Sequence, residues 1–448
     1  ALPTTATQAQ QLVTDLVPLN ISSAQPLAET ATMGVLKRLW NQLLPGAPVP
    51  AAEDDFFELG GDSIQVIYLM WELAKHGWAV NVQDLQRCSL LGQQHVLLSR
   101  LPRRETPASK TETYQVGNEL SAPVLAPPAI QKFYQQGHTN PDRFVFSALL
   151  RFSAAIHGDR AHQAVHTIIQ RHLSLRSAVV KGCDGRIFLR PMPAGEEVPY
   201  YTCVVTEPSQ DNIFAEPTVA EFVARLESHL SVSQGKLVVV GEITYGSDNY
   251  LLLVVHHFAV DLVSWTLLVD ELETLYAAPE IRSSLPAPTS YYDLCLALAN
   301  AKPTPTERAY WQRLRETSEH CGQLPTIHSN DALFANSAVW EISLSEDADV
   351  WQQKDSDSLY CTLLVALARS LSRVHGQNLS MITVEVHGRD SLGVPGGVLQ
   401  VGDLAVSHPL MLDAEFSVQE MRDHVKRVPK NGIGYTTAED LVRSTVVQ

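Results

Sequence analysis

Two long apolar runs constrain the fold of this chain more than any other feature. Residues 236–245 ("KLVVVGEITY") and 250–257 ("YLLLVVHH") are rich in Val, Leu and Ile, with few polar interruptions. Runs of this length and composition predict strands that are buried in a sheet. Amphipathic patterns at residues 159–173 and 261–276 predict helices beside them. The chain is therefore expected to build a large α/β unit.

The same alternation continues to both sides of these runs. From Leu125 onward the sequence predicts further strands at residues 144–152, 339–344 and 380–386. It also predicts helices over residues 361–374 and 417–426.

The first hundred residues have a different, wholly helical pattern. Residues 32–44 place apolar side chains at helical spacing, and Pro45–Gly46 ends that run. Three more helical patterns follow, beginning at Ser63, at residue 82 and at residue 90. Residues 28–101 are therefore expected to form a small all-α unit of four helices. Polar residues 102–124 read as a linker, and residues 1–27 as an N-terminal linker.

Composition narrows the range of partners and compartments. The formal net charge is −16, from 49 acidic and 33 basic residues, and the basic residues form no run that could follow a phosphate backbone. Nucleic acid is therefore excluded as an expected partner. Neither a signal peptide nor a membrane-spanning run is recognisable, which predicts a cytoplasmic protein without a membrane partner.

The cysteines and the chain start add two smaller expectations. The six cysteines are scattered without a CxxC pair, which predicts no metal site and favours buried free thiols. The first residue is not Met, so the chain is expected to be a piece of a longer protein.

A motif around Ser63 points to covalent chemistry. In "FFELGGDSI", residues 56–64, two glycines precede a serine at a helix start, where the helix favours an anion. A plain helix cap is the alternative. The segment resembles the attachment site of peptidyl carrier domains, which implies 4′-phosphopantetheine bound covalently to Ser63 over a carrier domain at 28–101. Asp62 resembles the variant of carriers that feed epimerization domains. A phosphopantetheinyl transferase is then an implied partner.

The second motif is "HHFAVDLVSW", residues 256–265. Because side chains alternate along a strand, His256 and His257 cannot share a role, and one of them must face the core. A histidine pair alone is more typical of a packed core than of a catalytic site. The segment resembles the HHxxxDxxSW motif of the condensation superfamily of nonribosomal peptide synthetases, and its Ser264–Trp265 end is that of epimerization domains.

That resemblance implies a fold and a set of roles. The fold would be two-lobed and chloramphenicol-acetyltransferase-like, with an N-terminal lobe at 125–285 and a C-terminal lobe at 286–448. His257 would be the reacting imidazole. His256 and Asp261 would support it, Asp261 as a buried charge paired with an arginine for which Arg389 is a candidate.

Two later segments complete the implied site. "MITVEVHGRDS" places Glu385 where the family has a second acid/base group, and its valine neighbours predict a buried carboxylate. A glutamate on a strand rim is the alternative. "RVPKNGIGY" resembles a family segment in which Tyr435 would donate a hydrogen bond to the developing oxyanion, supported by Asn431. A turn before a helix is the alternative there.

Three departures from the family pattern stand out. Val386 and Asp390 replace a glycine and a glutamate near Glu385, and Asp403–Leu404 stands where Trp-Phe is usual. The latter predicts an altered wall of the substrate channel. The chain also ends before the usual C-terminal motif, so the C-terminal lobe is expected to lack its end.

The resemblance as a whole implies an isomerase. The domain would convert the α-carbon of an L-aminoacyl or peptidyl thioester to the D form, between an upstream adenylation domain and a downstream condensation domain. Two alternatives stay open: an amide-forming condensation domain, or a degenerate domain that only docks carriers. The sequence does not name the amino acid.

Overall fold

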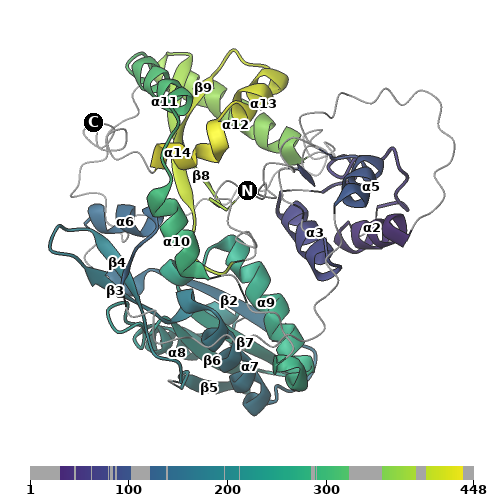
Figure 1. The fold of residues 1–448 in the computed structure, drawn as a ribbon. Coiled ribbons are helices and arrows are strands. Elements are labelled where there is room, and N and C mark those ends of the chain that lie inside the picture. The colour runs from purple at the N-terminus through teal and green to yellow at the C-terminus, as the bar shows by residue number, and fades with distance from the viewer. Residues whose placement is uncertain are drawn as a thin grey trace, which may run out of the picture.

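The structure is a computed structural model. It describes residues 31–44, 47–61, 63–78, 80, 84–85, 88–101, 122–137, 140–195, 197–210, 212–283, 288, 290–321, 356–389 and 400–436. Figure 1 shows a small helical unit beside a larger α/β body of two lobes.

The helical unit is built on helices α2 (Ala31–Leu43), α3 (Ser63–Lys75) and α5 (Leu91–Arg100). They enclose an apolar core whose largest buried rings are Trp40 and Phe56, edge to face with centroids 5.0 Å apart. The helix expected over 82–88 falls mostly outside the described residues, as does Asp62.

The N-terminal lobe contains a four-stranded sheet in the order β2 (Val145–Phe152), β7 (Asp248–His256), β6 (Val238–Tyr245) and β5 (Tyr200–Val205). Only the β5–β6 pair is parallel. Helices α7 (Gly158–Arg171) and α9 (Leu262–Ala277) cover one face, and α8 (Pro217–Glu227) covers the other. Alternate residues of β7 enter two separate cores, so the two apolar runs form strands buried on both faces, as predicted.

A smaller sheet in the order β1 (Val124–Leu125), β4 (Ile187–Pro191) and β3 (Ser177–Lys181) lies next to α6 (Pro128–Gln135) and α10 (Tyr291–Asn300). Helix α10 packs its tyrosines into the core of the N-terminal lobe.

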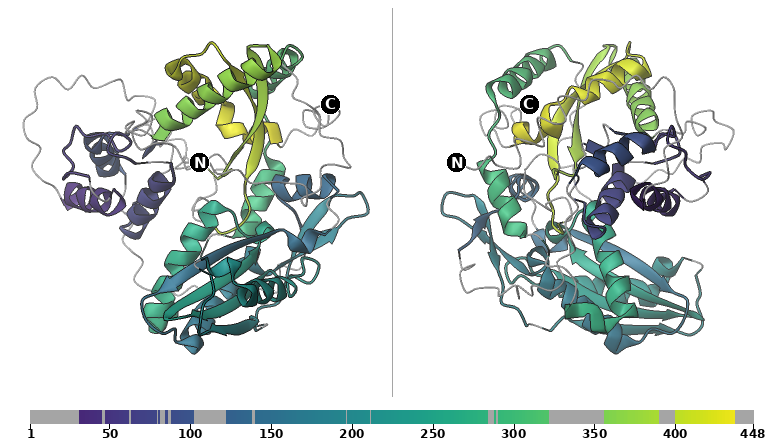
Figure 2. Two further views of the ribbon diagram at one scale, coloured as in Figure 1. Left: turned by 180° about the vertical axis from the view of Figure 1, so that it is seen from behind. Right: turned by 45° about the vertical axis from the view of Figure 1, so that its right-hand side comes forward.

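The C-terminal lobe has its own core around the antiparallel pair β8 (Leu379–Val386) and β9 (Val406–Asp413). Helices α11 (Pro305–Ser318), α12 (Ser356–His375), α13 (Val418–Lys426) and α14 (Ile433–Thr436) surround the pair. One end of β8–β9 points toward the N-terminal lobe in each view of Figure 2. The strand expected at 339–344 lies outside the described residues.

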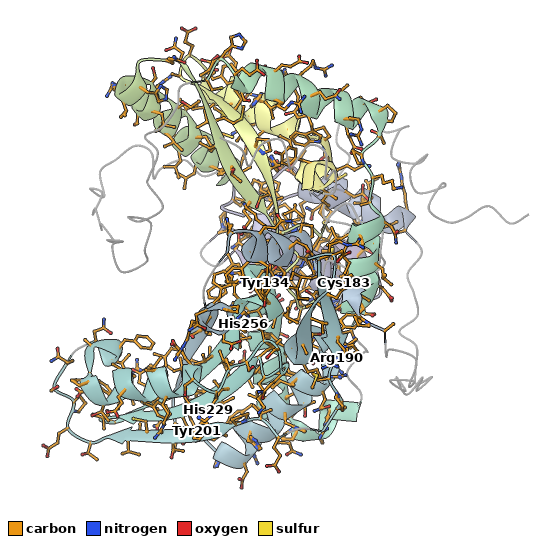
Figure 3. The ribbon with its side chains drawn as sticks, turned by 90° about the vertical axis from the view of Figure 1, so that its left-hand side faces the viewer. Tyr134, Cys183, Arg190, Tyr201, His229 and His256 are labelled. Atoms are coloured by element: carbon orange, nitrogen blue, oxygen red, sulfur yellow. The ribbon has the colours of Figure 1, made fainter. Side chains whose placement is uncertain are left out.

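The structure bears on the expectations about membrane-spanning helices, metal sites and cysteines. No helix in the described part of the chain is long and apolar enough to cross a membrane. A search of those same residues finds no cluster of side chains that could hold a metal ion. The expectation of buried thiols is wrong for Cys183, which is exposed on the loop between β3 and β4 (Figure 3), whereas Cys203, Cys295 and Cys361 are buried.

Candidate active site

The histidine pair lies where strand β7 ends. His256 is its last residue, and His257 opens the short 3-10 helix η4 (His257–Ala259). His256 is fully buried: its Nε2 lies 2.7 Å from the carbonyl oxygen of Pro141, and its Nδ1 accepts from the backbone N–H of Phe258 at 3.2 Å. Burial lowers the pKa of His256 to about 4, so the ring is neutral at pH 7. His256 therefore faces the core, as strand alternation required of one member of the pair.

The ring of His257 stacks on two phenyl rings. It stacks on Phe144 with centroids 4.5 Å apart and on Phe146 with centroids 5.3 Å apart, both nearly parallel. The side chain is 29% exposed, yet its Nδ1 is buried and has no hydrogen-bond partner. The exposed part of the ring is therefore not Nδ1, and Nε2 is the nitrogen available to a reactant.

Asp261 and Arg389 form a buried ion pair close to the histidine. Asp261 caps α9, accepting from the N–H and Oγ–H of Ser264 at 2.9 and 2.8 Å. Both terminal nitrogens of Arg389 donate to its carboxylate, one of them at 2.8 Å. Burial alone would raise the pKa of Asp261, but the charge and hydrogen bonds of Arg389 and the donors of Ser264 hold it below its usual value. The arginine that the resemblance left open is thus in place.

This pair also fastens the loop that leads into β9. Arg389 donates to the carbonyl oxygens of Gln400 and Gly402, both at 3.1 Å, and Ser264 Oγ accepts from the Gly402 N–H at 2.9 Å. Residues from both lobes therefore meet at the first turn of α9.

Gly388 makes the approach of Arg389 possible. Its φ of +64° is in the left-handed region, and a Cβ there would come within 2.0 Å of the carbonyl oxygen of Leu404. Only glycine lets the backbone after β8 pass this close to the loop.

Trp265 is the last residue of the histidine motif and lies in the core of the N-terminal lobe. It is buried, and its ring meets Phe146 edge to face with centroids 5.7 Å apart. It therefore supports one of the two rings that hold His257.

The expectation that Glu385 is buried is wrong. Glu385 lies on β8 opposite Ser407 of β9, and its side chain is exposed. Within the part of the chain that the structure describes, β8 has a single partner strand. Successive side chains of β8 alternate in exposure, and Glu385 falls on the exposed set. The two valines beside it are only partly buried. Apolar neighbours in the sequence therefore did not indicate a buried position for Glu385.

Tyr435 lies in the core of the C-terminal lobe. Its ring packs on Trp311 with centroids 5.2 Å apart. Asn431 is exposed at a φ of +49°, in the turn before α14. Their roles in the reaction stay predictions.

Asp403 lies beside the histidine motif, a place that the sequence did not reveal. It was expected only to alter a channel wall, yet it is 3% exposed and its Oδ2 lies 3.8 Å from Nδ1 of His257. Burial raises its pKa well above the usual range, and the charges of Asp261 and Glu385 act in the same direction. The sequence did contain one sign of this unusual place: an aspartate stands at a position where the resemblance leads one to expect an aromatic residue.

The helical unit presents Ser63 as the first residue of α3. Gly60, at a φ of +98°, has open space where a Cβ would be, and a Cβ on Gly61 would come within 2.3 Å of the Phe56 ring. The backbone before the serine is thus accessible on one side and closely packed on the other. Unpaired amides at a helix start suit a phosphodiester. The segment fits a phosphopantetheine arm.

The helical unit also contacts the histidine motif. Val263, in the first turn of α9, is 6% exposed and belongs to the apolar cluster formed by α2, α3 and α5. Its neighbour Leu262 is 60% exposed.

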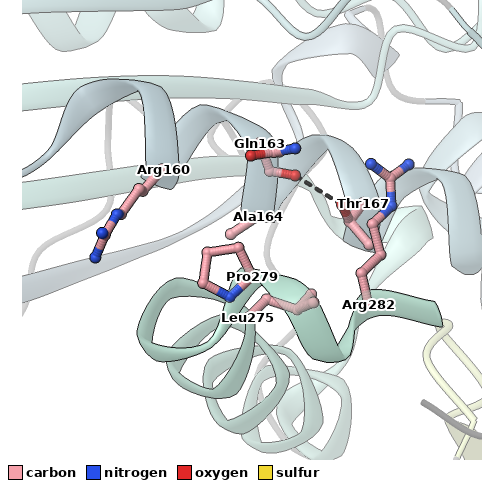
Figure 4. Close-up of a pocket in the computed structure, with 7 residues that line it drawn as sticks. All are labelled: Arg160, Gln163, Ala164, Thr167, Leu275, Pro279 and Arg282. Carbon is pink, nitrogen blue, oxygen red and sulfur yellow. Dashed lines mark hydrogen bonds between the residues drawn. The ribbon is translucent and has the colours of Figure 1, made fainter. Parts of the chain in front are cut away.

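A small pocket between α7 and η5 (Pro279–Ser283) lies away from these groups (Figure 4). It is lined by Arg160, Gln163, Ala164, Thr167, Leu275, Pro279 and Arg282. Leu275 follows Trp265 by ten helical residues, which is about 15 Å along α9. The pocket does not belong to the histidine site.

Two family models match the chain. The condensation domain model matches residues 128–429, and the phosphopantetheine attachment site model matches residues 34–93. Surfactin synthase subunit 1 of Bacillus subtilis is 24% identical over 90% of the chain, and bacitracin synthase 2 of Bacillus licheniformis is 24% identical over 89%. The chain spans only 11% and 15% of these two relatives.

Solved structures agree with this fold. The epimerization domain of the third module of tyrocidine synthetase B superposes with a TM-score of 0.61 at 21% identity, covering 71% of this chain and 77% of that one. The first condensation domain of the calcium-dependent antibiotic synthetase superposes with a TM-score of 0.55 at 17% identity, covering 72% and 77%. The chain therefore belongs to the condensation-domain family, with a chloramphenicol-acetyltransferase-like fold, and carries a helical domain for covalent attachment of 4′-phosphopantetheine.

Proposed function

We propose that the chain epimerises the α-carbon of an aminoacyl or peptidyl thioester carried on Ser63. The proposal rests on Asp403, a buried carboxyl group that lies beside His257 of one lobe and is affected by the charge of Glu385 of the other. His257 comes from the end of β7 and Glu385 from β8, and both interact electrostatically with Asp403. Inverting a centre needs a proton removed on one face and returned on the other, which two such groups supply.

The surroundings of the two groups suit this task. His257 has a fixed ring plane and one nitrogen available, and Glu385 is exposed and free to meet a bound substrate. The phosphopantetheine arm, once attached, holds the acyl group as a thioester, which makes the α-hydrogen more acidic than in an amide. Tyr435 is the proposed donor to the charge that develops on the carbonyl oxygen.

The position of the helical unit supports delivery to this site. Val263 belongs to the apolar cluster of that unit and lies six residues after His257. Ser63 is the proposed attachment residue. An upstream adenylation domain and a downstream condensation domain are the proposed partners, since the relatives are much longer synthetases. A phosphopantetheinyl transferase is the proposed source of the arm.

Loading the chain with an L-aminoacyl phosphopantetheine in D₂O tests the proposal. Epimerisation gives deuterium at the α-carbon together with a mixture of L and D residues. Amide formation with a second loaded carrier, without deuterium exchange, would show a condensation domain instead. Neither product would show a domain that only docks carriers.

A further inference from the structure

Asp403 has contacts that the proposed reaction leaves unexplained. Its carboxylate is buried where the two lobes meet, with Oδ2 3.8 Å from Nδ1 of His257. Nδ1 is itself buried and has no hydrogen-bond partner. An unpartnered N–H in that position costs free energy, and the carboxylate is the acceptor that faces it.

The His257 ring can move toward this acceptor. Phe144 and Phe146 stack on it at interplanar angles of 11° and 15°, which restrains rotation out of the ring plane but leaves sliding within that plane. A shift of about 1 Å would bring 3.8 Å to the usual hydrogen-bond distance. Hydrogen bonds at reacting groups often tighten in this way when the substrate binds.

Other contacts hold Asp403 in place independently of His257. Its Oδ1 accepts from the N–H of Ala405 at 3.3 Å. Its two neighbours on the loop are fastened to the Asp261–Arg389 pair: Gly402 through its carbonyl oxygen, and Leu404 through an N–H that lies 3.4 Å from Asp261. The carboxylate is therefore presented by a fixed loop.

We propose that Asp403 is a positioning residue for His257: its carboxylate accepts the proton on Nδ1 and leaves Nε2 as the nitrogen that exchanges a proton with the substrate. This rests on the proposed epimerisation. In the step, the substrate C–H bond breaks, its electron pair stays on the substrate, and the proton bonds to Nε2. The positive charge that results on the ring is balanced by the Asp403 carboxylate.

Burial raises the pKa of Asp403, and the charges of Asp261 and Glu385 raise it further, whereas the Ala405 N–H and Arg389 act against this rise. A hydrogen bond from the protonated Nδ1 of His257 favours the ionised carboxylate, because a donor stabilises the charged form of an acid. The proposed contact therefore supplies the donor that this buried carboxylate needs.

Asp403→Asn tests the proposal because it keeps an oxygen for the Ala405 N–H but replaces the carboxylate by an amide. Nitrogen NMR of ¹⁵N-histidine-labelled protein, with the His257 signals identified by their loss in His257→Ala, gives the protonated nitrogen directly. We expect protonated Nδ1 in the unaltered chain and a shift toward protonated Nε2 in Asp403→Asn. Identical ring protonation in the two proteins would overturn the proposal.

The rate of α-hydrogen exchange gives a second measurement. In Asp403→Asn the rate should fall by on the order of 10²-fold, because the wrong ring nitrogen carries the proton. Asp423→Asn, an exposed change on α13, is the control and should leave the rate unchanged.

The outcomes separate the two proposals. If the unaltered chain exchanges no α-hydrogen, epimerisation is wrong, while the ring protonation still decides the role of Asp403. If exchange occurs and Asp403→Asn leaves its rate unchanged, only the role of Asp403 is wrong. If Asp403→Asn does not fold, Asp403→Ala replaces it, because alanine removes the carboxylate without adding a hydrogen-bond donor. We expect Asp403→Ala to lose the preference for a protonated Nδ1, and a preserved preference would contradict the proposal.

Discussion

Two adjacent histidines end in opposite surroundings because a strand alternates its faces. His256 has both ring nitrogens satisfied by backbone groups, whereas the His257 side chain is 29% exposed and its Nδ1 has no hydrogen-bond partner. Strand alternation predicted the difference, and only the structure shows which partners produce it.

The burial of His256 makes stability depend on pH. Its pKa is about 4 in the folded protein and about 6.5 when unfolded, so the unfolded chain binds more protons between these values. The free energy of unfolding is therefore not reduced by this group above pH 6.5, and it falls by about 3 kcal/mol as the pH drops to 4. Urea unfolding at several pH values measures this. His256→Gln should be less stable at pH 7 and show a flatter dependence in that window; an unchanged slope would contradict the assignment.

At His257 and Glu385 we predict a loss of activity without a loss of folding. His257→Ala and Glu385→Gln should each lower α-hydrogen exchange by about 10²–10⁴-fold, the usual contribution of a positioned proton-transfer group. Phosphopantetheine loading, followed by mass spectrometry, should be unaffected. Glu415→Gln, an exposed change after β9, is the matched control. Mixing of L and D residues that survives both active-site changes would rule out the assignment.

At the scale of elements, the turn after β8 allows the backbone at Gly388 to lie close to the loop at Leu404. Gly388 and Gly376 both have positive φ, +64° and +73°, but a Cβ would collide with Leu404 only at Gly388. Gly388→Ala should therefore cost about 1–3 kcal/mol more than Gly376→Ala, since only the former adds a clash to the backbone strain. Denaturant midpoints of the two variants measure the difference. Equal midpoints would show that the loop at 400–404 adapts freely.

Helix α9 contacts two parts of the molecule at once. Its cap, Asp261, belongs to the lobe junction, while Val263 packs into the core of the helical unit. Val263→Asp should release that unit from α9, because it places a charge in an apolar contact. Leu262→Asp adds the same charge one residue earlier on an exposed position, so it should leave the contact intact. Amide hydrogen exchange along α3 should rise only in Val263→Asp, and equal protection in both would place the contact elsewhere.

Over the whole molecule, periodicity predicted elements well and surroundings less well. The sequence predicted the buried strands β6 and β7 and the covering helices α7 and α9. Their long apolar or amphipathic runs are each compatible with only one type of secondary structure. The exposure of Glu385 and the burial of Asp403 do not follow, because each depends on which segment from far along the chain lies opposite. The ion pair of Asp261 with Arg389 joins residues 128 apart, a distance that no local pattern spans.

The connection between the helical unit and the larger body predicts reaction within one chain. A short flexible linker holds two parts at an effective concentration in the millimolar range, and residues 102–124 are the predicted linker. At micromolar protein, exchange within one chain should then exceed exchange between chains by about 10²–10³-fold. A loaded His257→Ala chain mixed with an active Ser63→Ala chain measures the reaction between chains, which should rise in proportion to concentration. The unaltered chain should show a rate independent of concentration. If the mixed pair matches the unaltered chain at micromolar concentration, delivery does not depend on the linker, and Ser63 serves its own catalytic site no better than that of a neighbour.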